Sequence, residues 1–165
     1  MRRIFSVLVE NKAGVLSRIS GLFSRRGYNI NSLSVGETDD ESISRMTISA
    51  TGDERILEQI EKQLNKQIDV IKVQTMDMHL STRREFILLK VSCQPNTRGE
   101  IMDVCTILRA KIVDISHTTI TIEASDIPEN IDLLIDMMTP YGIIEMARTG
   151  MVALQKGSEA ITIKK

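Results

Sequence analysis

The chain has 165 residues, of which 42% are hydrophobic and 26% are charged, and its formal net charge at pH 7 is -1. This balance is typical of one soluble globular domain or two small ones, and it excludes a polycationic protein for nucleic acid or membrane surfaces. No apolar run reaches membrane-spanning length, the run from Ile4 to Val9 is too short for a signal peptide, and the 2 cysteines lack metal-type spacing. We therefore expect a cytoplasmic protein in a reducing compartment.

The first half of the chain alternates between strand-like and helix-like patterns. Alternation of apolar and polar residues predicts four strands, at residues 3–10, 29–37, 43–50 and 68–75. Helical patterns follow Gly14 and Asp53, and Asp53 can cap its helix. This order is that of the ferredoxin-like motif, an antiparallel sheet with two helices on one face. In the third strand Arg45, Thr47 and Ser49 form a polar face, which we expect to meet solvent or a partner.

The same pattern begins again in the second half. The segment from Asn96 to Ile101 repeats the segment from Asn11 to Leu16 at an offset of 85 residues. Thr97 and Glu100 have the spacing of a capping box, and Pro128 fits the first turn of a second helix. Four further strands are predicted at residues 85–93, 111–116, 119–124 and 143–147, and residues 150–154 are expected to extend the last strand or to pair separately. Such self-similarity indicates a duplicated unit.

We therefore predict an α+β protein of two ferredoxin-like βαββαβ units with antiparallel sheets and helices on one face. The first unit spans residues 1–76, a connector 77–84, the second unit 85–155 and a tail 156–165. Each unit is near the smallest size that holds a core unaided, and each exposes a sheet face and a sheet edge. We accordingly predict a homodimer.

The segment from Asn11 to Asn31 contains the best candidate for a binding site. The first N–H groups of the helix after Gly14 have no intrahelical partner, and a glycine lets a carboxylate approach them closely. Asn11 and Asn29 bracket this helix with amide groups, so we predict capture of a small amino acid. The buried stripe of this helix is predicted to comprise Val15, Leu16, Ile19, Leu22 and Phe23.

The two ends of this helix are too far apart to form one site within a chain. Gly14 and Asn29 are separated by roughly 18 Å of helix, so they can meet only across an interface between two chains. Simple turn chemistry also explains an Asn-x-x-Gly sequence before a helix, and Asn29 can start a strand for backbone reasons. Spacing alone leaves both interpretations open.

We find no arrangement of residues that points to catalysis. His79 and His117 lie in a connector and at a strand end, outside any triad or metal pattern. Cys93 and Cys105 are interpreted as buried, inert thiols, and Asp39-Asp40-Glu41 as a solvated hairpin tip. The strands lack the exposed aromatic residues of RNA-binding sheets, and no phosphate-binding glycine loop is present. We expect no catalytic residue, metal site or cofactor in this chain.

Several motifs together resemble the regulatory small subunits of acetohydroxyacid synthase (acetolactate synthase), and the first unit resembles an ACT domain. The resemblance spans nearly the whole chain and is densest in the first 75 residues. Its main motifs are Gly14-Val15-Leu16-Ser17-Arg18, Arg25-Arg26-Gly27-Tyr28-Asn29-Ile30, Ser44-Arg45-Met46-Thr47 and Ala147-Arg148-Thr149-Gly150.

The resemblance implies a protein without an active site of its own. It would activate the catalytic large subunit, which carries thiamine diphosphate, Mg and FAD, and would make it sensitive to feedback inhibition by branched-chain amino acids, above all L-valine. By position, one protomer would bind the effector through Asn11, Ala13, Gly14, Val15 and Leu16, and the other through Asn29 and Ile30. In the second unit Glu100 stands at the position of Val15 and would repel a carboxylate, so we expect one effector site per chain.

Two alternatives belong to other classes of function. The chain could be a free-standing ACT-type amino-acid sensor that regulates another enzyme, which predicts that no thiamine-diphosphate protein co-purifies with it. It could also be a small ferredoxin-like enzyme such as an acylphosphatase, which predicts turnover by the isolated chain.

Overall fold

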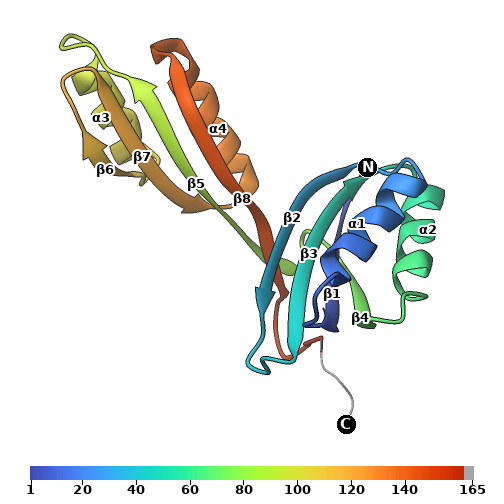
Figure 1. Ribbon diagram of the computed structural model, residues 1–165. Helices are drawn as coiled ribbons and strands as arrows, with labels where there is room; N and C mark the ends of the chain where they lie inside the picture. Colours follow the sequence, from blue (N-terminus) through green and yellow to red (C-terminus); the bar gives the residue numbers. More distant parts are fainter. Residues whose placement is uncertain (162–165) are drawn as a thin grey trace. The chain divides into compact units, whose positions relative to one another are not determined.

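The computed structural model describes residues 1–161 and contains two compact units. The first comprises Met1–Thr82 and the C-terminal residues from Met151, and the second comprises Arg83–Gly150. Each unit is an antiparallel sheet with two helices on one face (Figure 1). The predicted α+β class and duplicated ferredoxin-like unit are therefore confirmed. Of the tail predicted at 156–165, residues 162–165 lie outside the described part of the chain.

The strands and helices of the first unit come in the predicted order. The bounds of its strands differ from the predicted bounds by at most about two residues. Its sheet has the strand order β2-β3-β1-β4, with every neighbouring pair antiparallel. The elements are β1 (Arg2–Glu10), α1 (Val15–Arg25), β2 (Ile30–Glu37), β3 (Ile43–Thr51), α2 (Glu54–Leu64) and β4 (Val70–Met76).

The main core of the first unit lies between this sheet and its two helices. Phe5, Val7 and Val9 of β1 alternate toward the helices, and all three are almost fully buried. The carboxylate of Asp53 accepts a 2.8 Å hydrogen bond from the N–H of Ile56, so the predicted cap of α2 forms. Leu16 does not join the predicted stripe of α1. Its side chain is 45% exposed, because it lies at the margin of the face that meets the sheet.

The opposite face of the first sheet, expected to meet solvent or a partner, is covered by a segment of the same chain. Thr47 and Ser49 are only 4% and 0% exposed. Part of the cover comes from the end of β8 (Ile143–Gln155), which continues through the predicted extension at residues 150–154. Its residues Met151 and Ala153 form a small buried cluster with Ile4 and Met76. Periodicity could not reveal this contact, because β8 is remote in sequence from the sheet that it covers.

The second unit repeats the architecture of the first, with the equivalent strand order β6-β7-β5-β8. Its core contains Ile87, Leu89 and Val91 of β5, and Cys93 and Cys105 are buried in it as predicted. The remaining elements are β5 (Ser81–Ser92), α3 (Arg98–Ile107), β6 (Lys111–Ile115), β7 (Thr119–Asp126), α4 (Pro128–Met138) and the short 3-10 helix η1 (Thr139–Tyr141).

The predicted capping box at the start of α3 is wrong. The hydroxyl of Thr97 accepts a hydrogen bond from the N–H of Gln94 at 3.1 Å and caps no helical N–H. The carboxylate of Glu100 instead accepts a 3.1 Å hydrogen bond from the hydroxyl of Tyr141. Gly99 lies inside α3, whereas Gly14 precedes α1. The repeated sequence therefore does not produce a repeated helix start.

Candidate functional site

The start of α1 is an open, glycine-led helix N-terminus. Gly14 has a left-handed backbone with φ 85°, which L side chains rarely adopt. The N–H of Arg18 donates to the Gly14 carbonyl at 3.0 Å, and that of Val15 to the Lys12 carbonyl at 3.3 Å. Among the described residues, the N–H groups of Leu16 and Ser17 have no hydrogen-bond partner. Two free donors at the positive end of a helix can bind a carboxylate.

Asn11 ties the turn before α1 to the hairpin between β2 and β3. Its backbone N–H donates to the Ser42 carbonyl at 2.7 Å. Its side-chain Nδ2 donates to Glu37 Oε1 at 3.0 Å and to the Glu41 carbonyl at 2.8 Å. Both amide hydrogens are thus used within the chain, which leaves the Oδ1 oxygen as an acceptor for a ligand. An acceptor suits an ammonium group better than a carboxylate.

An ion pair that the sequence did not indicate secures the first turn of α1. Arg18 Nε donates to Asp69 Oδ2 at 2.6 Å, and the Asp69 carbonyl accepts from the N–H of Glu10 at 2.9 Å. The hydrogen bond from Arg18 lowers the pKa of the Asp69 carboxyl below its usual value. A Cβ at Gly14 would lie 3.1 Å from Arg18 Nη1, so the glycine also leaves room for this arginine. No local pattern links Arg18 to Asp69, which lies 51 residues later.

The structure brings some of the predicted site residues together and leaves others apart. Asn11, Ala13, Gly14 and Leu16 are exposed around the start of α1, whereas the side chain of Val15 is 2% exposed and faces the core. The other two predicted residues, Asn29 and Ile30, lie at the far end of the helix. Since α1 has 11 residues, about 16 Å of helix separates the two groups within one chain.

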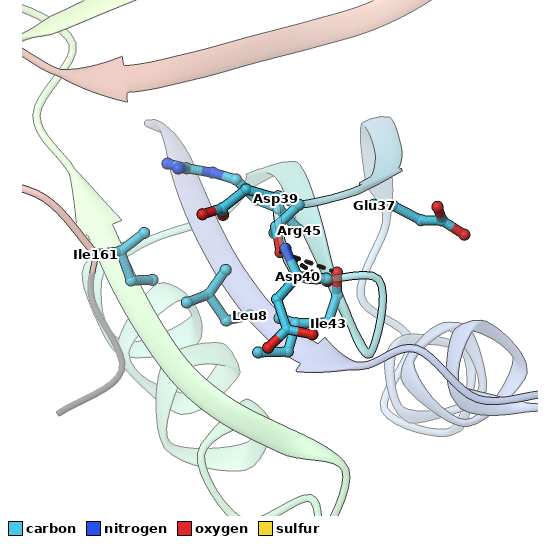
Figure 2. A pocket seen from close by; sticks show the side chains of 8 residues that line it. Leu8, Glu37, Asp39, Asp40, Ile43, Arg45 and Ile161 are labelled. Carbon is cyan, nitrogen blue, oxygen red and sulfur yellow. Dashed lines mark hydrogen bonds between the residues drawn. The ribbon is translucent and has the colours of Figure 1, made fainter. Parts of the chain in front are cut away.

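The first unit also has an open pocket at the other side of the β2–β3 hairpin (Figure 2). Figure 2 shows the side chains of Asp39, Asp40 and Arg45 around it. Hydrogen bonds from the hydroxyl and backbone of Ser42 lower the pKa of the Asp40 carboxyl, so this group is charged at neutral pH. The full lining is Leu8, Glu37, Thr38, Asp39, Asp40, Ile43, Arg45 and Ile161. The pocket is lined by three carboxylates and one guanidinium, which disfavours an anionic ligand, so the start of α1 is the better candidate for carboxylate binding.

Neither metal chemistry nor a membrane span is indicated within residues 1–161. No group of three or more His, Cys, Asp or Glu in this range could hold a metal ion. No helix in the same range is long and apolar enough to cross a membrane.

Family models match both units of the chain. One described as "AHAS small subunit-like ACT domain" matches residues 5–72, the range that contains the site at α1. A second, described as "Small subunit of acetolactate synthase", matches residues 84–157. Fold and matches together define the class of the protein, which is an ACT-domain regulatory subunit.

Individual relatives are similar to this chain over nearly its full length. The chain is 48% identical over 156 residues to the acetolactate synthase small subunit of Mycolicibacterium smegmatis, covering 94% of this chain and 92% of that one. It is 42% identical over 160 residues to the acetolactate synthase isozyme 3 small subunit of Escherichia coli, covering 96% and 98%. The crystal structure of the small subunit from Thermotoga maritima matches with a TM-score of 0.88 at 35% identity, covering 96% and 99%.

The chain belongs to the family of acetolactate synthase small subunits. It is therefore a regulatory subunit, and its family implies a catalytic large subunit as partner. This membership favours a regulatory small subunit over the two alternatives, a free-standing amino-acid sensor and a small ferredoxin-like enzyme.

Proposed function

We propose that this chain binds and activates the catalytic large subunit of acetolactate synthase and makes it sensitive to feedback inhibition by L-valine. The observation that carries the proposal is the exposed start of α1, where the N–H groups of Leu16 and Ser17 are free beside Gly14. Thiamine diphosphate, Mg and FAD would be bound by the catalytic partner. That partner would condense pyruvate with pyruvate or 2-oxobutyrate.

The chemistry of this turn fits an aliphatic amino acid. The free N–H groups would bind the carboxylate, and Asn11 Oδ1 would accept from the ammonium group. The exposed side chain of Leu16 would contact the aliphatic part of the ligand. A polar or charged side chain on the ligand would find no partner at Leu16, which supports a branched-chain amino acid.

The complete site requires a homodimer. β2 is an edge strand of the first sheet and can pair with β2 of a second copy. Two-fold antiparallel pairing sets the end of one strand beside the start of the other. Glu37, at the end of β2, is bonded to Asn11, and Ile30 begins the same strand. Such pairing would bring Asn29 and Ile30 of one protomer toward the α1 turn of its partner.

Inhibition would follow from a difference in affinity. Valine must bind the inhibited arrangement of the holoenzyme more tightly than the active one, and a coupling free energy of about 1–3 kcal/mol is typical of such systems. A ligand held between two protomers would change their packing, and through it the contact with the catalytic subunit.

A glycine-to-aspartate pair of variants tests the proposal. Gly14→Asp places a carboxylate where the effector carboxylate would bind, and we expect it to lose valine binding in calorimetry and valine inhibition in the reconstituted holoenzyme. Activation should remain near the wild-type level. Gly14→Ala tests the strain of the positive φ without the charge. Gly99→Asp, an exposed position near the start of α3, is the matched control. Normal valine inhibition of the Gly14→Asp holoenzyme, or a wild-type holoenzyme that ignores valine, would contradict the proposal.

A further inference from the structure

The face of the first sheet opposite α1 and α2, here called the outer face, is polar and yet covered. Part of its cover is the strap, defined as residues 151–155 at the end of β8 (Figure 1). Met151 and Ala153 of the strap pack on Ile4 and Met76, and these four residues are at most 4% exposed. The apolar contact beneath the strap is therefore small.

Most of the buried polar atoms without a hydrogen-bond partner in the described chain lie on this outer face. Four of these five side-chain atoms lie on the outer face, namely Ser6 Oγ, Ser32 Oγ, Arg45 Nε and Gln74 Oε1. The fifth, Arg98 Nε, lies in the second unit. Strand register places the four on one face. Ser6 is opposite Gln74, Ser32 is opposite Ser49, and Arg45 is opposite Leu8. Ser49 also pairs with Ile4, which contacts the strap.

Two opposing effects act on the closure of the strap. Closing it buries a few apolar side chains, which favours the closed state. It also removes water from polar atoms that gain no partner in exchange, which opposes closure. Because the two effects act against each other, a modest change in the contacts of the strap shifts the fraction of chains in which it is closed.

Arg45 is a sheet residue that reaches the strap directly. Its Nη2 donates to the Ala153 carbonyl at 3.2 Å. No carboxylate lies within ion-pair distance of its guanidinium among the described residues, and the group is partly buried. The orientation of this side chain is therefore set by the backbone of β3 and by the strap.

Arg45 is also connected to the candidate effector turn. Three hydrogen bonds from Asn11, to Glu37, Glu41 and Ser42, fasten that turn to the β2–β3 hairpin. β3 leaves this hairpin at Ile43, and Arg45 follows two residues later. The turn and the segment of β3 that carries Arg45 are therefore joined by a short stretch of hydrogen-bonded backbone.

We propose that Arg45 couples the effector turn to the strap, so that a ligand bound at the turn changes how firmly the strap closes on the outer face. The inference rests on the proposed function, because it takes the start of α1 as the effector site. β8 enters the strap from the second unit through Gly150, so the ligand would act on a strand shared by both units. Arg45 is a positioning residue in this scheme and does not contact the ligand.

Hydrogen exchange of the full-length chain tests the coupling, with peptides that cover residues 151–155 as the readout. In the wild type, saturating L-valine should slow exchange of the strap at least threefold. Arg45→Met, which keeps an unbranched side chain and removes the donors, should accelerate strap exchange at least fivefold and remove the valine effect, while valine affinity stays within twofold. Arg45→Lys should restore part of the effect, because an ammonium group can still donate to the Ala153 carbonyl.

Two further variants keep the test specific. Arg2→Met is the matched control, since Arg2 Nε donates to Ser49 Oγ at 2.7 Å and makes no hydrogen bond to the strap among the described residues. It should leave the valine effect on the strap unchanged. Ser6→Ala removes an unpartnered hydroxyl from the outer face and should slow strap exchange without any ligand.

The outcomes separate the two proposals. A wild-type chain that does not bind valine would overturn the proposed function, while the ligand-free effects of Arg45→Met and Ser6→Ala would still test the strap. Normal valine binding with an unchanged strap response in Arg45→Met would overturn the coupling alone. In the holoenzyme, we expect Arg45→Met to retain activation and to need at least fivefold more valine for half-maximal inhibition.

Discussion

The side-chain amide of Asn11 donates a 3.0 Å hydrogen bond to the carboxylate of Glu37, which links the turn before α1 to the end of β2. The two residues are 26 positions apart, and no pattern in the sequence joins them. The link makes Asn11 both a ligand candidate and a support for the turn that holds Gly14.

We expect Asn11→Ala to weaken L-valine binding about tenfold, because the turn loses two hydrogen bonds and the ligand loses an acceptor. Isothermal titration calorimetry measures this directly. Asn65→Ala is the control, since Asn65 Nδ2 also donates to a backbone carbonyl, that of Glu61, at the end of α2. Equal valine affinity in the two variants would rule out a role for Asn11.

Val35 reports on the proposed β2 interface. It is 44% exposed on the edge strand β2, and Val35→Lys would place two like charges near the two-fold axis of a β2–β2 pair. We expect sedimentation velocity to show at least about tenfold weaker dimerisation, with weaker valine binding in parallel. Ile71→Lys is the matched control, because Ile71 is 38% exposed on β4, the opposite edge of the same sheet. Dissociation by Ile71→Lys and not by Val35→Lys would place the interface at the other edge.

The ion pair of Arg18 with Asp69 predicts a pH dependence of stability. Because the hydrogen bond from Arg18 lowers the folded-state pKa of Asp69, the pair stabilises the fold above the unfolded-state pKa of about 3.9. That stability is lost as pH falls through the lower, folded-state pKa. In urea titrations Asp69→Asn should therefore unfold at lower urea than the wild type at pH 6, and the difference should shrink below about pH 4. A difference that stays constant down to pH 2.5 would exclude this origin. Asp103→Asn, an exposed change on α3, serves as control.

An ion pair between the partly exposed Arg148 and the buried Glu85 connects β8 to β5 within the second unit. Arg148 Nε and Nη2 each donate to the carboxylate of Glu85 at 2.8 Å, and Glu85 is only 6% exposed. Arg148→Met leaves this carboxylate buried without its partner and should destabilise the second unit by about 3 kcal/mol. The double variant Arg148→Met with Glu85→Leu should recover more than half of that loss. Urea unfolding, detected through hydrogen exchange of peptides from β5, measures the stability of the single and the double variant. Additive losses in the double variant would show that the pair is not coupled.

Local rules predicted the elements around the candidate site. Alternation of Phe5, Val7 and Val9 identified the strand face that meets the helices, because side chains alternate across a strand. The start of α1 after Gly14 and the Asp53 cap of α2 are also as predicted, since both depend on neighbours within a few residues.

Predictions failed where a distant residue competed with a local one. Thr97 and Glu100 have the right spacing for a capping box. The Glu100 carboxylate instead accepts a hydrogen bond from the hydroxyl of Tyr141, 41 residues later. The polar face of β3 was expected to meet solvent or a partner, but Arg45 donates to the Ala153 carbonyl of the same chain, 108 residues away. Neither partner has a local signature that reveals it.

By itself, the sequence determined the order of strands and helices, the duplication of the unit and the glycine-led start of α1, because periodicity and backbone sterics act over a few residues. Only the tertiary structure decided that Asn11 is bonded to Glu37, that Arg18 is paired with Asp69 and that the end of β8 covers the outer face. These contacts join residues far apart in the chain. Which of them form is determined by how α1, the first sheet and the C-terminal segment pack together, and not by any pattern within one of these segments.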